Sequence, residues 1–295
     1  MAKRKNKVSS GTIKSILVGF IAVLAIGGII FGITRIKYIG GDDVTSEVVV
    51  EPSDPLAHLM PEQKAYVEQI KMTYSKSDAL LSIIENIDKY SPSMMKSLML
   101  RHEMIDYIEG FPTASKKGFA NAKNIDISAE CTKGKVPLFI QWDSRWGYET
   151  YGTDVFGLNG CGPTAMAMVY VGLTGDTTMN PLKMGEFCID QNYYYDYQGT
   201  SNDLYNVGAG LLGLNVRQIT VSAASMKEYL QNGYVLVAHV LKGDFTSEGH
   251  FIVLTGIDAD GKITVNDPNS REKSAVTWDA DKIIGQTASM WAFSK

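Results

Sequence analysis

The nine residues from Gly160 to Met168 read GCGPTAMAM, and the fold is best approached from them. Pro163 suits the first position of a helix, because its φ is already helical and its missing N–H is not needed there. A helical pattern then continues through Tyr170. Cys161 is therefore predicted to lie at a helix N-terminus, where unpaired N–H groups and the helix dipole favour a thiolate. A small buried cysteine in a tight turn is the alternative, and the residues downstream decide between the two.

The C-terminal third of the sequence predicts an antiparallel sheet. Apolar runs at Val235 to Val240, Phe251 to Ile257 and Ile263 to Val265 are typical of buried strands. Ala259-Asp260-Gly261 lies between the last two runs and is a hairpin signal. The chain is thus expected to reverse direction there and to pair these two strands.

This hairpin determines how His250 and Asp267 are related. Side chains alternate along a strand, so His250 shares a face with Ile252 and Leu254. Folding about the turn opposes Asp267 to Ile252 or to Leu254, depending on the length of the loop. Both registers place Asp267 on the face of His250, so an orienting hydrogen bond is feasible in either.

A thiol, an imidazole and a carboxylate are the parts of a covalent acyl-transfer site. In this interpretation His250 takes the thiol proton and later returns it to the leaving amine, while Asp267 holds the tautomer of the imidazole. The oxyanion needs donors, and the backbone N–H of Cys161 is one. Gln141 is the candidate for the second. Asn159 is ranked below it, because a residue two positions before a helix-start cysteine need not point into the site.

Three stretches between Val136 and Pro268 resemble a known family: VPLFIQWDSRW, GCGPTAMAM and GHFIVLTGIDADGKITVNDP. Together they are similar to papain-superfamily cysteine peptidases related to the bacteriocin-processing, double-glycine-leader peptidases, the peptidase C39-like group. The similarity spans a little under half of the chain and keeps the order of the three motifs. It implies a triad of Cys161, His250 and Asp267, with Gln141 in the oxyanion hole and a peptide or protein as substrate.

Two features separate this chain from the enzymes it resembles. The leader peptidases are fused to the membrane and ATPase domains of a transporter, which this sequence does not show, so their substrate is not expected to transfer. Gln141 also lies 20 residues before Cys161, further than is usual in papain-like enzymes. The chain is not papain itself, because the Cys-Gly-Ser-Cys-Trp signature is missing and His250 follows the cysteine by only 89 residues.

The fold expected from these observations is α+β and papain-like. A helical half would contain Cys161, an antiparallel sheet half would contain His250 and Asp267, and the cleft would lie between them. The roughly 165 residues from Cys131 onward are enough for one compact core.

Near the N-terminus, residues 15–34 form an uncharged run of 20 residues, Ser15 to Thr34. As a helix this run spans roughly 30 Å, enough to cross a bilayer. A cleaved signal peptide is the alternative, but no Ala-x-Ala site follows the run. The sequence therefore predicts a single-pass anchor in the cell membrane, with the N-terminus cytoplasmic and the catalytic domain extracytoplasmic. The basic residues that precede the run are Lys3, Arg4, Lys5, Lys7 and Lys14.

Between the anchor and the peptidase motifs the sequence predicts a linker and a helical region. Pro61 suits a helix start, Ala79 to Tyr90 repeats apolar residues at helical spacing, and Ser91-Pro92 begins a third helix that would run to about Tyr107 or Ile108. A propeptide or substrate-recruiting role is one interpretation of this region. A core stripe is the more economical one, formed by Met94, Met95, Leu98 and Met99.

The predicted organisation is therefore a basic tail at 1–14, a transmembrane helix at 15–34, a linker at 35–60, a helical region at 61–130 and a papain-like domain at 131–295.

Charge and motif content exclude several other functions. Removing the five positive charges before residue 15 from the formal net charge of −4 leaves −9, which argues against a nucleic-acid partner. Metal and nucleotide motifs such as His-Glu-x-x-His and the Walker loop are missing, so no cofactor or metal is expected. Gly208 to Gly213 matches a dinucleotide fingerprint by letter, but the fingerprint needs a strand before it and a helix after it. Here a helix is predicted at 203–212 and a strand follows at 216–221, which is the reverse order. Cys131 and Cys188 either pair or remain free thiols.

The function predicted from the sequence is that of a membrane-anchored, extracytoplasmic cysteine peptidase that acts through a thioester acyl-enzyme. Two alternatives stay open. One is a thiol acyltransferase or amidase acting on a cell-wall or glutathione-like peptide. The other is a peptide-binding module that keeps the fold without turnover.

Overall fold

The computed structural model describes residues 61, 64–65, 67–68, 78–132 and 134–295. The described residues belong to one compact unit. The predicted tail, membrane anchor and linker, residues 1–60, lie outside them. None of the helices formed by the described residues combines the length and the apolar character needed to span a bilayer.

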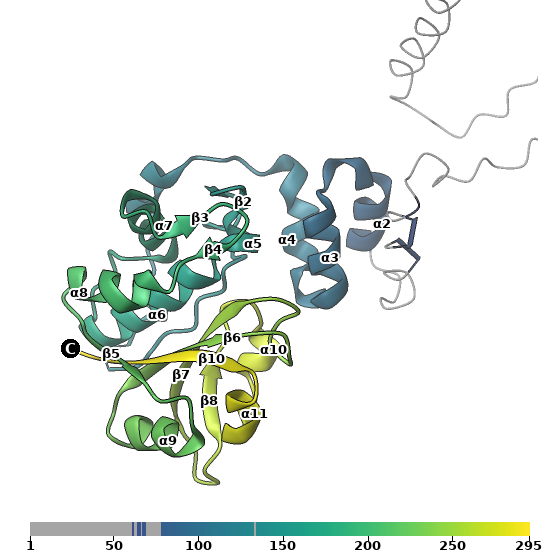
Figure 1. The fold of residues 1–295 in the computed structure, drawn as a ribbon. Helices are drawn as coiled ribbons and strands as arrows, with labels where there is room; N and C mark the ends of the chain where they lie inside the picture. The colour runs from purple at the N-terminus through teal and green to yellow at the C-terminus, as the bar shows by residue number, and fades with distance from the viewer. Residues whose placement is uncertain (1–60, 62–63, 66, 69–77, 133) are drawn as a thin grey trace, which may run out of the picture. The chain divides into compact units, whose positions relative to one another are not determined.

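The second half of the unit is built on a six-stranded antiparallel sheet (Figure 1). The strands predicted at 235–240, 251–257 and 263–265 are all present and pair in the predicted order. The strand order is β5-β10-β6-β7-β8-β9. The bounds are β5 Asn215–Ile219, β6 Val235–Val240, β7 His250–Ile257, β8 Ile263–Asn266, β9 Thr277–Trp278 and β10 Thr287–Ser294.

The β7–β8 hairpin adopts one of the two predicted registers. Gly261 closes the turn with a φ of 76°, a left-handed conformation that suits glycine. Val253 pairs with Asn266, and a bulge follows after Leu254. Asp267 is the first residue after β8, and the same register opposes it to Ile252.

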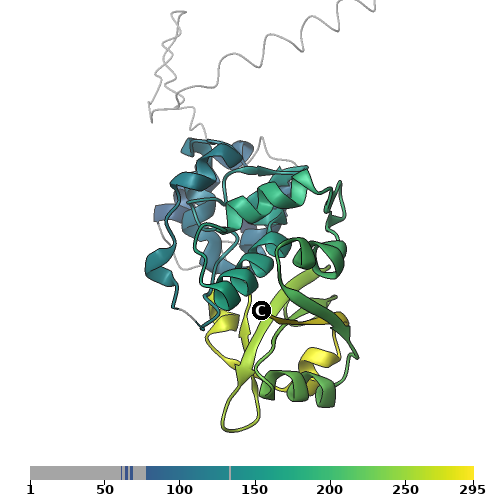
Figure 2. The ribbon, with the colours of Figure 1, turned by 90° about the vertical axis from the view of Figure 1, so that its left-hand side faces the viewer.

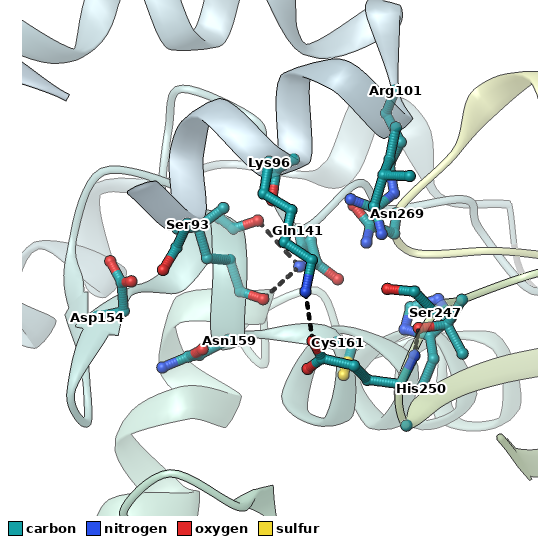
Figure 3. A pocket seen from close by; sticks show the side chains of 17 residues that line it. Ser93, Lys96, Arg101, Gln141, Asp154, Asn159, Cys161, Ser247, His250 and Asn269 are labelled. Atoms are coloured by element: carbon teal, nitrogen blue, oxygen red, sulfur yellow. Dashed lines mark hydrogen bonds and ion pairs between the residues drawn. The ribbon is translucent and has the colours of Figure 1, made fainter. Parts of the chain in front are cut away.

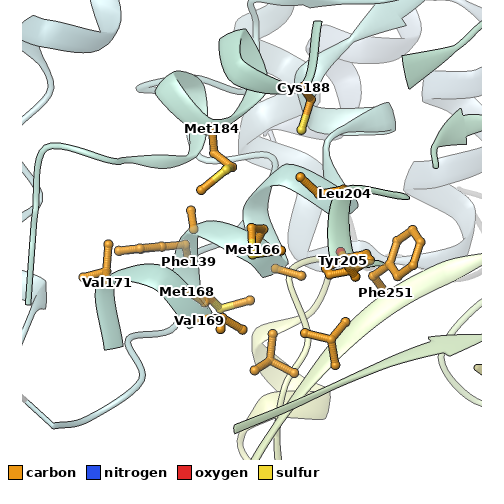
Figure 4. Close-up of a cluster of buried hydrophobic side chains, with 14 of the residues drawn as sticks. Phe139, Met166, Met168, Val169, Val171, Met184, Cys188, Leu204, Tyr205 and Phe251 are labelled. Atoms are coloured by element: carbon orange, nitrogen blue, oxygen red, sulfur yellow. The ribbon is translucent and has the colours of Figure 1, made fainter. Parts of the chain in front are cut away.

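The two faces of the sheet pack against different helices. One face contributes Val237, Phe251 and Val253 to a cluster built around helix α6, which Figure 4 shows from close by. The opposite face contributes Ile252 and Leu254 to a second cluster. The alternation of strand side chains thus places helices on both faces of the sheet. The second cluster is completed by side chains of α9 Ala223–Gln231 and α11 Ala280–Ile284.

Helix α6, Cys161–Thr174, starts at the predicted cysteine. Gly160 is its N-cap residue, so Pro163 is the third residue of the helix and not the first. The correction is small, because the N–H of a third residue still lacks a partner within the helix and proline loses little there. Gly175 ends the helix in the left-handed conformation, with a φ of 74°.

Most of α6 is buried, because the helix lies between the sheet and further helices. Met166 and Met168 have no exposed surface, and α7, Pro181–Asp190, packs alongside. In Figure 1 α6 and α7 lie at one end of the unit, and the sheet lies at the other with α9 and α11 beside it; Figure 2 shows the same arrangement from the side. Short elements complete this part: β1 Thr150–Tyr151, β2 Asp154–Val155, α5 Phe156–Asn159, β3 Tyr194–Tyr195 and β4 Gly199–Thr200.

The helix predicted at 203–212 is present but contains a π-helical segment. Residues Leu204–Gly208 form the π turn and α8, Ala209–Leu211, continues it. A Cβ at Gly208 would lie 2.8 Å from the ring of Tyr193, so glycine is needed there for close packing. Within this stretch only Gly208 serves close packing, because a Cβ at Gly210 or Gly213 would meet open space, and Gly213 instead adopts a positive φ of 75°.

The helical region contains α2 Asp78–Glu85, α3 Pro92–Leu100 and α4 Ile105–Gly110. Ser91 caps α3, because its Oγ accepts a hydrogen bond from the N–H of Met94 at 3.2 Å. The single third helix predicted from residue 92 to about 107 is wrong. The chain leaves the helix at Arg101, with a φ of −146° and a ψ of 94°, and a 3₁₀ turn at His102–Met104 leads into α4.

The break at Arg101 has a tertiary cause. No Gly or Pro marks it, so the local pattern predicts an uninterrupted helix. Glu103, just after the break, accepts a hydrogen bond from the N–H of Arg271 at 2.8 Å and another from the hydroxyl of Ser270. Polar contacts with a segment far along the chain thus replace the continuation of the helix.

The predicted core stripe of the helical region is confirmed. Met94, Met95 and Leu98 are buried, and they share one cluster with Ile140 and Trp142 of the peptidase domain. The helical region and the peptidase domain are therefore packed together through a common apolar interface.

Candidate active site

A cleft lies where α3, α5, the start of α6 and the loop before β7 meet (Figure 3). Cys161, His250 and Gln141 all line it. Each comes from a different part of the chain: a helix N-terminus, the first residue of a strand and an irregular segment. The structure therefore brings three of the four predicted site residues to one cavity, and the fourth, Asp267, lies behind His250.

Cys161 is partly exposed and opens into this cleft beside His250, as Figure 3 shows. Gly160 and Gly162, on either side of Cys161, place no side chain over the sulfur. A Cβ at Gly162 would lie 2.5 Å from the side chain of Thr200, so this position admits only glycine. Because Cys161 is partly exposed and lines the cleft, the alternative of a buried, inaccessible cysteine is wrong.

His250 and Asp267 form a buried pair. The Nε2 atom of His250 lies 2.7 Å from Oδ1 of Asp267, and the two side chains are 3% and 0% exposed. A carboxylate at this distance takes its hydrogen bond from a protonated Nε2, which leaves Nδ1 of the ring for Cys161. The predicted juxtaposition of these two side chains is thus present.

The surroundings of Asp267 hold its carboxylate in one orientation. Oδ1 also accepts a hydrogen bond from the N–H of Asn269 at 2.8 Å, and the N–H of Asp267 donates to Oγ of Ser274 at 2.8 Å. Oδ2 is buried and receives no hydrogen bond. The next segment is fixed as well, because the carbonyl of Pro268 accepts from the N–H of Gln141 at 2.7 Å.

The electrostatics of the cleft favour an imidazolium. Burial by itself lowers the pKa of His250, but the charge and the hydrogen bond of Asp267 raise it, and the Cys161 sulfur adds to the rise. The resulting pKa is about 9, well above the ordinary 6.5. At neutral pH His250 is therefore protonated next to the cysteine sulfur.

Gln141 is buried beside the cleft with its amide held in a defined direction. Its Nε2 donates to the carbonyls of Gly157 at 2.9 Å and of Leu158 at 3.2 Å. The opposite orientation of the amide would place Oε1 against these two carbonyls, so the assignment is firm. Oε1 itself is buried without a partner.

Asn159, the lower-ranked candidate for the oxyanion donor, is directed elsewhere. Its Nδ2 donates to the carbonyl of Tyr151 at 3.3 Å and to the hydroxyl of Tyr194 at 3.2 Å. Figure 3 shows the amide pointing away from Cys161. Both amides therefore donate to groups other than the Cys161 sulfur, and both residues line the cleft.

Residues 133–294 match the sequence profile of the Peptidase_C39 like family. The chain belongs to this family. The match covers more than half of the sequence, and it includes all four predicted site residues. No curated protein matched the chain. The mixed helix and antiparallel sheet of the Peptidase_C39 like domain agree with the α+β fold expected from the sequence.

The Peptidase_C39 like domain does not supply the whole cleft. Ser93, Lys96 and Arg101 also line it, and they belong to α3 and the residue after it, outside the matched range. Sequence reasoning missed all three, because α3 reads as an ordinary amphipathic helix with a core stripe. The one available signal was the polar face of α3 itself, and it does not say what that face adjoins.

The other two cysteines are not part of the site. In the described part of the chain Cys131, Cys161 and Cys188 are all free thiols. Burial raises the pKa of Cys188 to about 12, so it stays an inert thiol. Among the residues that the structure describes, no three His, Cys, Asp or Glu side chains are arranged to hold a metal ion.

Proposed function

We propose that this protein is a cysteine peptidase in which Cys161 is the nucleophile, His250 the acid and base, and Asp267 the group that orients His250. The observation that supports this most directly is the position of His250, between the Asp267 carboxylate at 2.7 Å and the Cys161 sulfur in an accessible cleft. Membership of the Peptidase_C39 like family supports the same conclusion.

In the proposed resting state the Cys161 proton resides on Nδ1 of His250. The raised pKa of His250 favours this distribution, because the imidazolium persists to alkaline pH. The helix dipole of α6 adds a further stabilisation of the thiolate at its N-terminus.

Acylation would begin when the thiolate attacks the carbonyl carbon of a peptide bond. The carbonyl oxygen becomes an oxyanion, and the backbone N–H of Cys161 donates to it. Gln141 would supply the second donor by giving up its longer hydrogen bond, the 3.2 Å contact with Leu158. The imidazolium of His250 protonates the leaving amine as the C–N bond breaks, and a thioester remains.

Deacylation would use the same groups in reverse roles. Neutral His250 takes a proton from water, and the resulting hydroxide attacks the thioester carbonyl. The C–S bond then breaks, the acid product leaves, and the proton on His250 restores the thiolate–imidazolium pair. Asp267 keeps Nε2 protonated throughout, so Nδ1 always faces the reacting atoms.

The proposed location follows from residues 15–34, which lie outside the described part of the structure. Their length and lack of charge support an uncleaved membrane anchor, with the peptidase domain on the extracytoplasmic side. The substrates would then be peptides or proteins at the outer surface of the membrane.

The test is peptide-library profiling of the full chain, purified in detergent, beside a Cys161→Ala variant. We expect cleavage by the wild type, none by Cys161→Ala, and unchanged cleavage by Cys131→Ala, a matched variant that removes a thiol outside the cleft. An amine acceptor added in parallel distinguishes hydrolysis from acyl transfer.

Reaction with a thiol-reactive peptide electrophile provides an independent readout of the nucleophile. Rapid labelling of Cys161 is expected. Labelling no faster than that of a free thiol, together with unchanged behaviour of Cys161→Ala, would contradict the peptidase proposal and leave a peptide-binding module.

A further inference from the structure

Arg101 is a cation in the cleft for which the proposed reaction has no use. It follows α3, where the helix breaks, and it lines the cavity together with Cys161 and His250. Figure 3 shows its side chain directed from the end of α3 towards Asn269. Its backbone is extended, with a φ of −146° and a ψ of 94°.

Within the part of the chain that the structure describes, Arg101 forms no ion pair. With the Asn269 amide turned so that its oxygen faces the guanidinium, that oxygen accepts from Nε at 3.2 Å and from Nη2 at 3.0 Å. A guanidinium has five N–H donors, so most of its capacity remains unused. A partly buried arginine whose only close acceptor is a neutral amide is electrostatically incomplete.

The nearby carboxylates do not complete it. Oδ1 of Asp267 is occupied by His250 and by the N–H of Asn269, and Oδ2 receives no hydrogen bond from Arg101. Glu103 is committed to Ser270 and to the N–H of Arg271. Burial lowers the pKa of Arg101, and the charges of Asp267, Cys161 and Glu103 partly offset this effect, yet neither carboxylate forms an ion pair with the guanidinium.

We propose that Arg101 binds a carboxylate of the substrate next to the scissile bond. A guanidinium and a carboxylate match in a planar, two-bond geometry, and the pair is strengthened by the partial exclusion of water. The carboxylate belongs either to an acidic side chain or to the free C-terminus of a short peptide. The inference deepens the proposed peptidase function and rests on it. Arg101 lies outside the residues matched by the family, so this selectivity is a property of this chain.

The experiment uses the full chain and matched peptides derived from the best library substrate. In a first series of pairs, each position of the peptide in turn is Glu in one member and Gln in the other. In a further pair the peptide ends in a free carboxylate or in a carboxamide. The wild type is expected to cleave one member of a pair with a kcat/KM about tenfold to a hundredfold higher, in favour of the carboxylate. The pair that shows the preference identifies the source of the carboxylate.

Variants then assign the preference to one residue. Arg101→Gln should abolish it while cleaving the neutral peptide as the wild type does. Arg101→Lys should keep part of the preference, because lysine retains the positive charge but lacks the paired N–H donors of the planar guanidinium. Arg217→Gln, which removes an exposed arginine of β5 outside the cleft, should keep all of it.

Two results would overturn the proposal. One is equal cleavage of both members of every pair by the wild type, a measurement that holds even if Arg101→Gln fails to fold. The other is an equal loss of charged and neutral substrates in Arg101→Gln, with slower alkylation of Cys161 by iodoacetamide, which would make Arg101 a positioning residue for Asp267 and His250. In both cases cleavage by the wild type stays intact, whereas failure of the peptidase proposal removes cleavage and rapid alkylation altogether.

Discussion

The peptidase domain and the helical region before it contribute different things to the same cleft. Cys161, His250, Asp267 and Gln141 all lie within the residues matched by the family, and they contain the groups needed for chemistry. The helical region contributes Arg101 and the neighbouring polar side chains of α3, which line the same cleft. Under the proposed function, reactivity belongs to the family domain and selectivity arises in part outside it.

The two regions also differ in how they are held. The site residues of the peptidase domain are fixed by helix and sheet backbone and by short hydrogen bonds such as the 2.7 Å contact of His250 with Asp267. Helix α3 is held against the peptidase domain by an apolar interface, in which Leu98 packs in one cluster with Trp142, and by polar contacts such as the ion pair of Lys96 with Glu248. Substitutions in the two regions should therefore have distinguishable consequences.

The largest effect is expected at His250. His250→Asn removes the acid and base of both half-reactions, so kcat should fall by about 10⁴-fold or more. The measurement is steady-state cleavage of the best library peptide, with the melting temperature as a check on folding. His239→Asn is the matched control, since His239 is the neighbouring histidine on β6, does not line the cleft and stacks on Phe251. A similar fall of kcat in His239→Asn would show that the loss in His250→Asn does not depend on a place in the active site.

Asp267→Asn should lower kcat/KM by about two orders of magnitude and change its pH dependence. Activity requires an imidazolium, and the pKa of His250 is about 9, so the wild type should lose activity as the pH rises through about 9. Asparagine lacks the charge that raises this pKa, and the alkaline limb should move to lower pH. An unshifted limb in Asp267→Asn would mean that Asp267 does not set the protonation of His250.

The same pKa shift predicts a pH dependence of stability. The folded-state pKa of His250 lies above its ordinary value of 6.5, so its contribution to stability is complete below pH 6.5 and is lost as the pH rises through about 9. Thermal melts of the wild type and of His250→Asn across this range measure the contribution. The difference between them should narrow towards alkaline pH, and a constant difference would contradict the assignment.

Leu98→Ala tests how the packing of α3 supports the cleft. Leu98 is fully buried, so the substitution should reduce the free energy of unfolding by about 2–5 kcal/mol. Because α3 positions Arg101, KM for carboxylate substrates should rise as well, while kcat for neutral ones changes little. Met226→Ala, at a fully buried position of α9, is the control, with a similar cost in stability and an unchanged KM. Denaturant titrations and kinetics on both variants separate the two effects.

The smallest effect is expected for the ion pair that links the two regions across the cleft. Nζ of Lys96 lies 2.7 Å from Oε1 of Glu248, and both side chains are at least half exposed. Exposed pairs contribute about 0–1 kcal/mol, so Glu248→Gln should change stability by no more than this. A large change in either stability or KM would show that this contact closes the cleft.

The sequence predicted the elements of the peptidase domain well, because their signals are local. The placement of Cys161 at the N-terminus of α6 and the strand from Val235 to Val240 agree with the structure, since a proline near a helix start and an apolar run act over a few neighbouring residues. The relation of Asp267 to His250 could be narrowed to two registers, and only the length and bulge of the β7–β8 hairpin selected one.

The helical region shows where such reasoning fails. Nothing between Pro92 and Ile108 marks a helix end, yet the chain leaves the helix at Arg101. The reason lies almost 170 residues away in sequence, where Ser270 and the N–H of Arg271 bond to Glu103. Contacts of this kind outweigh the modest helix propensity of a few residues.

The sequence by itself determined where the two candidate reactive side chains lie, since a cysteine at the start of a helix and an imidazole on a strand follow from local signals such as Pro163 and the alternation of strand side chains. The tertiary structure alone decided what surrounds them: which register brings Asp267 to His250, where the Gln141 amide points, and that Arg101 lines the same cleft as the cysteine. Local signals depend on neighbouring residues in the chain, whereas the environment of a site depends on packing and hydrogen bonds between segments that are distant in sequence.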